Sequence, residues 1–155
     1  MKKIITIFAF FLLLSCGFES IHSKKKNNKI YNFTISSIGF SGDNSINQNI
    51  KNGLINYIDN PEKPIKYDLI ISSLVNKTIT SKSLKGDPEI FYIEITIILE
   101  VLENDNLKNK ITFKEAFEYK NKSKKYELKK YEKNIQKNLS SKISKDIVEY
   151  LYSIK

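Results

Sequence analysis

Two pairs of carboxylates have a spacing that general acid and base catalysis could use. Glu94 and Glu100 form one pair, and Glu115 and Glu118 form the other. Such catalysis needs both groups in one site, with proton affinities matched to their tasks. All four glutamates fall where apolar and polar residues alternate, which is the pattern of a strand with one solvated face. We therefore expect solvated glutamates and predict that the protein is not an enzyme.

Other reactive residue types are scarce. Cys16 is the only cysteine and His22 the only histidine, so the chain can form no intramolecular disulfide, no CxxC redox pair and no cysteine-based zinc site. A single histidine cannot build a histidine metal cluster. The five glycines are scattered and form no phosphate-binding loop. We therefore expect no cofactor and no metal ion.

The residues before Cys16 suggest a different chemistry for this cysteine. Two lysines and an apolar run occupy residues 2–14, which is typical of a signal peptide. The run is too short for a transmembrane anchor, which needs roughly 20 apolar residues. The sequence Leu13-Leu14-Ser15-Cys16 resembles the bacterial lipobox, whose cysteine is acylated and becomes the first mature residue. We predict a lipoprotein signal peptide at residues 1–15 and lipidation at Cys16, with an ordinary signal cut as the alternative.

The segment after the cysteine is polar and has no helix or strand period. It contains a lysine-rich run at residues 24–29. We expect residues 16–29 to comprise the lipidated cysteine and a flexible tether, and the alternative is that these lysines bind anionic head groups near the anchor. Removal of residues 1–15 takes away two lysines and no acid, so the net charge falls from +9 to +7. All 26 basic residues are lysines, and in an Ile- and Asn-rich chain this charge is only weak support for an acidic partner.

A second lysine cluster precedes the C-terminal segment. Lys120, Lys122, Lys124 and Lys125 are interleaved with tyrosines, a mixture that binds nucleic acid in many proteins. An exported chain rarely meets nucleic acid, so we expect none as a partner. In the cell envelope these lysines would contact phosphorylated lipid or lipopolysaccharide as point charges. They are our candidate anionic-lipid contacts, and a solvated helix start is the alternative.

Hydrophobic periodicity predicts six elements between residues 30 and 155. Four are strands, at residues 31–38, 67–75, 90–102 and 110–119, and the last two form an antiparallel hairpin. Residues 39–44 are expected to be a loop, and residues 76–85 either extend the second strand or form an excursion. The first helix follows the capping box of Ser45 and Gln48 and ends before Pro61. The second is long, with apolar residues from Leu128 to Ile154 and Ser123 as its N-cap.

The order strand, helix, three strands, helix predicts a single α+β domain at residues 30–155. In this fold class two helices cover one face of a roughly four-stranded mixed sheet. The other face would carry Tyr92, Ile98 and Leu102 among polar residues. We expect this half-apolar face to be available to a partner or ligand.

Several of these features together resemble the LptE family of lipopolysaccharide-assembly lipoproteins. The lipobox is followed at once by Gly17 and Phe18, and the predicted element order is that of the family. The most characteristic stretch runs from Phe117-Glu118-Tyr119-Lys120-Asn121-Lys122-Ser123 into Tyr126-Glu127-Leu128-Lys129-Lys130-Tyr131-Glu132. In that family a final strand likewise leads through a short serine-containing link into a helix that runs nearly to the C-terminus.

The resemblance implies a function and partners. It implies a non-enzymatic lipoprotein that plugs and assists the assembly of the LptD β-barrel and helps deliver lipopolysaccharide to the outer leaflet. The expected partners are therefore an LptD-type barrel, lipopolysaccharide, and the membrane through the N-terminal acyl chains. Gly17, at the place where inner-membrane lipoproteins often carry Asp, implies the periplasmic face of the outer membrane. The alternative is an auxiliary envelope lipoprotein of an ABC transporter or of a barrel-assembly system.

Overall fold

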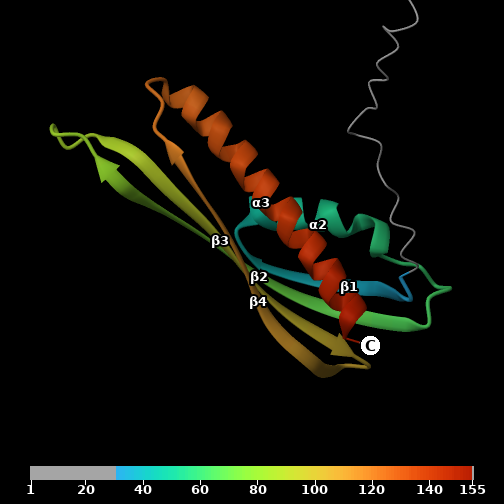
Figure 1. Cartoon of the computed structure of the whole chain (residues 1–155). Helices are drawn as coiled ribbons and strands as arrows, with labels where there is room; N and C mark the ends of the chain where they lie inside the picture. The colour runs from blue at the N-terminus through green and yellow to red at the C-terminus, as the bar shows by residue number, and fades with distance from the viewer. Residues whose placement is uncertain (1–30, 155) are drawn as a thin grey trace, which may run out of the picture. The chain divides into compact units, whose positions relative to one another are not determined.

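The computed structural model describes residues 31–154, and the predictions for the signal peptide, Cys16 and the tether lie outside them. The elements follow one another in the predicted order (Figure 1). They are β1 (Phe33–Gly42), α2 (Asn44–Leu54), the 3-10 helix η2 (Ile55–Tyr57), β2 (Ile65–Lys82), β3 (Pro88–Glu103), β4 (Asn106–Lys120) and α3 (Lys125–Ser153).

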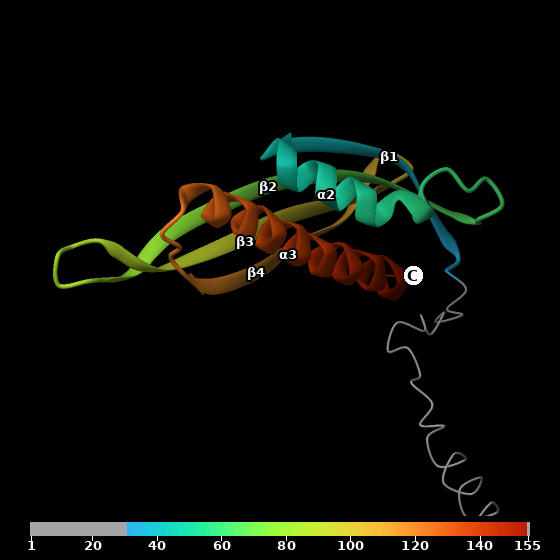
Figure 2. The same ribbon diagram turned by 90° about the horizontal axis from the view of Figure 1, so that it is seen from above.

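The four strands form one mixed sheet in the order β1-β2-β3-β4. β1 and β2 are parallel, because α2 carries the chain back before β2 begins. The β2–β3 and β3–β4 pairs are antiparallel. Both helices lie on the same side of the sheet (Figures 1 and 2), so the predicted α+β architecture is confirmed.

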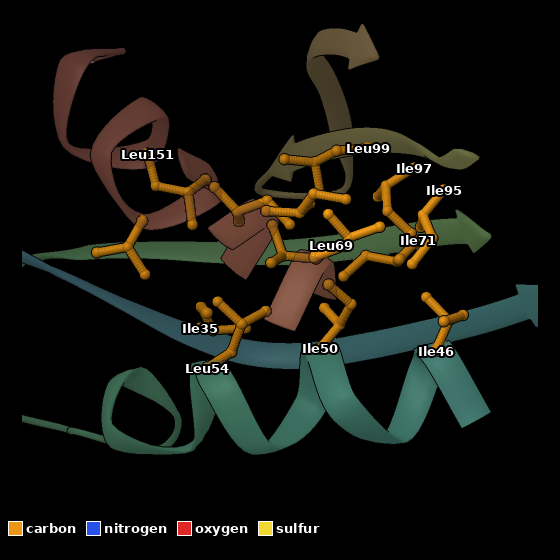
Figure 3. Close-up of a cluster of buried hydrophobic side chains, with 14 of the residues drawn as sticks. Ile35, Ile46, Ile50, Leu54, Leu69, Ile71, Ile95, Ile97, Leu99 and Leu151 are labelled. Carbon is orange, nitrogen blue, oxygen red and sulfur yellow. The ribbon is translucent and has the colours of Figure 1, made fainter. Parts of the chain in front are cut away.

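The alternation in β3 sets the core. All six predicted inward residues, from Phe91 to Val101 at every second position, are buried. From the helix layer, α2 places Ile46, Ile50 and Leu54 against the strands (Figure 3). From α3 a row of apolar residues ending at Leu151 completes the same cluster. Burial of such side chains contributes about 25 cal/mol per Å² of apolar area.

The two helices approach each other closely near Gly53 of α2. A Cβ atom at Gly53 would lie 2.4 Å from Ser144 Oγ and 2.5 Å from Ser144 Cβ of α3. The Ser144 hydroxyl is buried and donates to the Ser140 carbonyl at 2.9 Å. A glycine here therefore allows a close helix–helix contact that any larger residue would disturb.

Both predicted helix caps are wrong. The N-cap of α2 is Asp43, whose Oδ1 accepts a hydrogen bond from Ile46 N at 3.0 Å, so the Ser45–Gln48 capping box is not used. The N-cap of α3 is Lys124, which makes no side-chain cap bond, and Ser123 precedes it. For α2, the pairing of β1 with β2 as far as Ser73 fixes where the chain turns into the helix.

The first strand and the first helix also have bounds that differ from the predicted ones. β1 continues through the expected loop to Gly42, because the backbone there pairs with β2 as far as Ser73. Gly42 has a φ of 91°, and a Cβ atom would lie 1.9 Å from Ser73 O, so only glycine fits this exit from the strand. The α-helix ends at Leu54 and is followed by one 3-10 turn.

Residues 76–85, left open by the sequence, are mainly strand. β2 extends to Lys82 and pairs with β3 along most of this length. A turn follows, in which Ser83 Oγ accepts hydrogen bonds from the amides of Lys85 and Asp87. The result is a long β2–β3 arm that projects past the helices (Figure 1).

The predicted hairpin of β3 and β4 is confirmed, with a tight turn at Asn104 and Asp105. Both residues have positive φ, 52° and 62°, as a two-residue hairpin turn requires. β4 begins at Asn106, four residues before its predicted start. Of its inward-facing aromatic residues Tyr119 is buried, whereas Phe117 is 44% exposed.

Candidate functional site

The junction between β4 and α3 brings the predicted lysines to one end of the sheet. Lys120 ends β4, and Lys125 begins α3. Asn121 holds the link in place: its backbone amide donates to Glu89 O at 2.8 Å, and its side-chain amide donates to Pro88 O at 2.8 Å. Asn121 Oδ1 also accepts from the amide of Lys122 at 2.8 Å. This asparagine therefore ties the lysine-bearing link to the start of β3.

Two adjoining hollows flank this link. One has a volume of about 550 Å³ and lies against the start of β3; it is lined by Pro88, Glu89, Ile90, Lys120, Asn121, Lys122 and Ser123. The other has a volume of about 540 Å³ and lies on the α3 side; it is lined by Ile90, Phe117, Glu118, Tyr119, Lys120, Asn121, Lys122 and Tyr131. Both are open to solvent. Lys120 and Lys122 line both hollows.

The four candidate lysines are not equivalent. Lys124 forms an exposed ion pair with Glu127 at 3.2 Å. Within residues 31–154, Lys120, Lys122 and Lys125 form no ion pair, and Lys125 lines neither hollow. Lys122 Nζ lies 4.4 Å from the ring centroid of Tyr131, an attractive cation–π distance. The structure therefore brings Lys120 and Lys122 together and leaves Lys124 and Lys125 aside.

A partly buried polar cluster supports the aromatic side of this site. Tyr119, 4% exposed, donates a hydrogen bond to Glu132 Oε1 at 2.8 Å, and Lys77 Nζ lies 2.6 Å from the same oxygen. Burial, and next the hydrogen bond to Glu132, raise the pKa of the Tyr119 phenol far above its usual value, so Tyr119 remains a donor at any physiological pH. The Tyr119 and Tyr131 rings meet edge to face with centroids 5.9 Å apart. These contacts link α3 to β2 and β4 and fix the ring over which Lys122 lies.

Sequence reasoning missed two residues of this site. Asn121 lies between two of the predicted lysines, and a link asparagine before a helix is a known turn signal. Phe117 was expected in the core because it alternates with Tyr119, and only the course of α3 leaves it partly open. No sequence pattern predicts that Phe117 is partly exposed.

Of the four glutamates considered for catalysis, Glu118 lines the hollow on the α3 side, and the other three lie outside both hollows. Glu100 pairs with Lys110 at 2.7 Å, and Glu115 pairs with Lys142 at 2.7 Å. Glu118 accepts a weak hydrogen bond from Thr80 at 3.4 Å, and Glu94 accepts one from Thr96 at 3.4 Å. Within residues 31–154 no three His, Cys, Asp or Glu side chains are grouped to hold a metal ion. The geometry that is present suits the binding of an anion.

The sheet face away from the helices has an apolar centre. Tyr92, Ile98 and Leu102 lie there as predicted, half-buried or partly exposed. Ile98 pairs with Ser72 and is therefore diagonal to Ile70 and Leu74, both of which are exposed. No helix among the described residues is long and apolar enough to cross a membrane.

No protein-family model matches the chain, and no curated protein matches it in sequence. Solved structures do share its fold. Rare lipoprotein B from Shewanella oneidensis is 11% identical, with a TM-score of 0.57 over 76% of this chain and 95% of that one. A minor lipoprotein from Acinetobacter baumannii is 12% identical, with a TM-score of 0.60 over 80% and 92%. A lipoprotein from Caulobacter crescentus is 12% identical, with a TM-score of 0.53 over 79% and 89%. The fold of residues 31–154 is therefore one that bacterial lipoproteins adopt.

Proposed function

We propose that this protein is a lipid-anchored envelope lipoprotein of the LptE type. In this proposal it plugs and supports the assembly of an LptD-type β-barrel at the periplasmic face of the outer membrane, and helps deliver lipopolysaccharide. The observation that carries the proposal is the agreement between two independent features. The sequence Leu13-Leu14-Ser15-Cys16 resembles a lipobox, and the domain that follows has a fold found in solved lipoproteins along most of both chains.

The arrangement of the domain suits a plug. Its helices cover one face of the sheet, and the other face has an apolar centre at Ile70, Leu74 and Ile98. Exposed apolar surface of this kind is common at protein–protein contacts. Acyl chains on Cys16 would hold the protein at the membrane, since each buried CH₂ contributes about 0.8 kcal/mol. The anchor then raises the effective concentration of the domain beside a membrane-embedded barrel.

The paired hollows at Lys120 and Lys122 suit the second part of the function. The phosphates of lipopolysaccharide are anions that an ammonium group binds as a point charge. Neither lysine is neutralised by a carboxylate within residues 31–154. Such a site needs no cofactor, because binding and release of a lipid require no chemical step in this protein.

The test is the identity of the partner. Full-length, lipidated protein is affinity-purified from detergent-solubilised envelopes, and bound proteins are identified by mass spectrometry. We expect an LptD-type barrel in near-equal amount. Recovery of an ABC transporter, of another barrel machine or of no partner would overturn the proposal. The matched control is Cys16→Ala, which we expect to be unacylated and lost from outer-membrane fractions.

A further inference from the structure

A small apolar groove continues from the lysine site along the boundary of β4 and α3. It has a volume of about 150 Å³ and is lined by Phe117 of β4 and by Tyr131, Asn134, Ile135, Asn138 and Leu139 of α3. β4 is the edge strand of the sheet and runs beside α3 (Figure 2). Phe117 pairs with the buried Ile93, yet 44% of its own surface is exposed. The groove is therefore a part of the core face that the helix leaves uncovered.

Polar contacts border the apolar lining of the groove at both ends. At one end Glu115, two residues before Phe117 on the same face, pairs with Lys142 of α3 at 2.7 Å. At the other end Tyr119, two residues after Phe117, donates its hydrogen bond to Glu132. A strand rises about 3.4 Å per residue, so these contacts limit the apolar stretch to roughly 14 Å. Only a short apolar group fits between them.

The groove opens toward the lysines. It shares Phe117 and Tyr131 with the hollow lined by Lys120 and Lys122. Lys122 Nζ lies 4.4 Å from the centroid of the same Tyr131 ring. A hollow lined by two lysines, and also by Glu118, is thus joined to the apolar groove through two shared aromatic side chains. A ligand that spans both needs an anionic group next to a hydrocarbon chain.

We propose that this groove holds one end of a fatty acyl chain of a phosphorylated lipid whose phosphate lies at Lys120 and Lys122. The inference rests on the proposed function, in which such a lipid is delivered, and it names the part of the chain that would contact the acyl group. The size agrees, because an apolar cavity of about 150 Å³ holds a molecule as large as benzene. The groove therefore takes a short segment of one chain and leaves the rest of the lipid outside.

An extended polypeptide is a poorer occupant. A strand that covered Phe117 would have to pair with the free edge of β4. That edge carries Lys108, Lys110, Lys114 and Lys120, and lysines along an edge strand disfavour the addition of a further strand. A hydrocarbon chain needs no backbone pairing, so the lysines along this edge do not exclude it.

The test compares two probes that share a head group. Binding of the full-length protein in detergent is measured for hexa-acylated, bisphosphorylated lipid A and for the same phosphorylated disaccharide after removal of its acyl chains. We expect Phe117→Ser to weaken lipid A binding about tenfold, the loss of roughly one buried apolar contact. It should leave the affinity for the deacylated disaccharide unchanged. Lys122→Gln should weaken the binding of both probes.

Two further variants guard against effects on folding. Leu107→Ser removes another exposed apolar side chain of β4, 60% exposed and outside the groove, and should change neither affinity. Asn138→Leu adds apolar lining at an exposed helix position and should tighten lipid A binding alone. Equal effects of Phe117→Ser and Leu107→Ser, equal weakening of both probes by Phe117→Ser, or no binding of lipid A by the wild type would overturn the inference. Barrel recovery with the Phe117→Ser protein, tested separately, reports on the proposed function and not on the groove.

Discussion

Ser140 of α3 offers a test of how the helix layer is held on the sheet. Its side chain is fully buried, and its hydroxyl has no hydrogen-bond partner within the described residues. Ser144, one helical turn later, is also buried, and its hydroxyl donates to the Ser140 carbonyl at 2.9 Å. The two serines therefore share a helix face and a residue type but differ in hydrogen bonding. We predict that Ser140→Ala stabilises the protein and that Ser144→Ala does not.

The magnitude follows from three contributions. An unsatisfied buried hydroxyl costs about 1 to 3 kcal/mol, which the substitution recovers. Alanine also favours the helix over serine by up to about 0.7 kcal/mol. Against these, the void left by one oxygen atom costs well under about 1 kcal/mol, at about 24 cal/mol per Å³. The net change in the free energy of unfolding should be a gain of about 1 to 2 kcal/mol, which raises the Tm of a domain of this size by about 5 °C.

The assay is thermal and urea unfolding of the purified protein and both variants, followed by circular dichroism. Ser144→Ala serves as the control, because it removes one hydrogen bond worth about 1 kcal/mol but gains helix propensity, and the two nearly cancel. A fall in Tm for Ser140→Ala, or equal shifts for the two variants, would refute the reasoning. A fall in Tm would mean that the Ser140 hydroxyl has a partner in solution, and equal gains would mean that the Ser144 hydrogen bond contributes little.

Three further substitutions test other contacts. Gly53→Ala should lower stability by about 1 kcal/mol in urea unfolding, since overpacking against Ser144 outweighs the helix propensity gained, and added Ser144→Gly should restore part of the loss. Asp43→Ala should lower the free energy of unfolding by about 1 kcal/mol in thermal unfolding, because the N-cap of α2 is lost, whereas Ser45→Ala should be neutral. A larger loss for Ser45→Ala than for Asp43→Ala would show that the Ser45–Gln48 capping box is used instead. Burial, and next a nearby glutamate, raise the pKa of Asp146 above its usual 3.8. Ionised Asp146 therefore destabilises the folded protein, and this effect is complete at pH values above the raised pKa. Asp146→Asn should therefore raise the Tm at pH 7. This gain in Tm should shrink as the pH falls through the raised pKa, and it should vanish below pH 3.8. A gain that does not depend on pH would contradict this cause.

The parts of the fold that the sequence predicts are those with a strong local period. In β3, alternate residues from Phe91 to Val101 are apolar, and every one is buried. The helix caps were wrong for a reason that is not local. Whether Asp43 or Ser45 caps α2 depends on where β1 ends, and β1 ends where its pairing with Ser73 of β2 stops. A long-range contact therefore selects between two residues that are both good caps.

The candidate site likewise has one part that the sequence predicts and one part that it does not. Residue type alone marks Lys120 and Lys122 as possible anion contacts. The apolar groove beside them depends on the angle at which α3 crosses β4, and nothing near Phe117 in the sequence encodes that angle. Residues 76–82 are a third case, because their polar composition is compatible with strand or loop, and pairing with residues 88–94 of β3 decides it.

Within residues 31–154, five lysines form ion pairs with glutamates. Lys77 and Lys142 bind glutamates across the helix–sheet boundary, and Lys108 and Lys110 bind glutamates across the β3–β4 hairpin. These lysines stabilise the domain or solvate its edge, and their charge is locally cancelled. At the β4–α3 link the nearest paired lysine, Lys124, is likewise neutralised, whereas the pair that lines the hollows is not. Other described lysines, among them Lys114 and Lys129, also form no ion pair, so the hollows are what distinguish Lys120 and Lys122. Anion binding should therefore depend on these two lysines and on the ring of Tyr131, over which Lys122 lies.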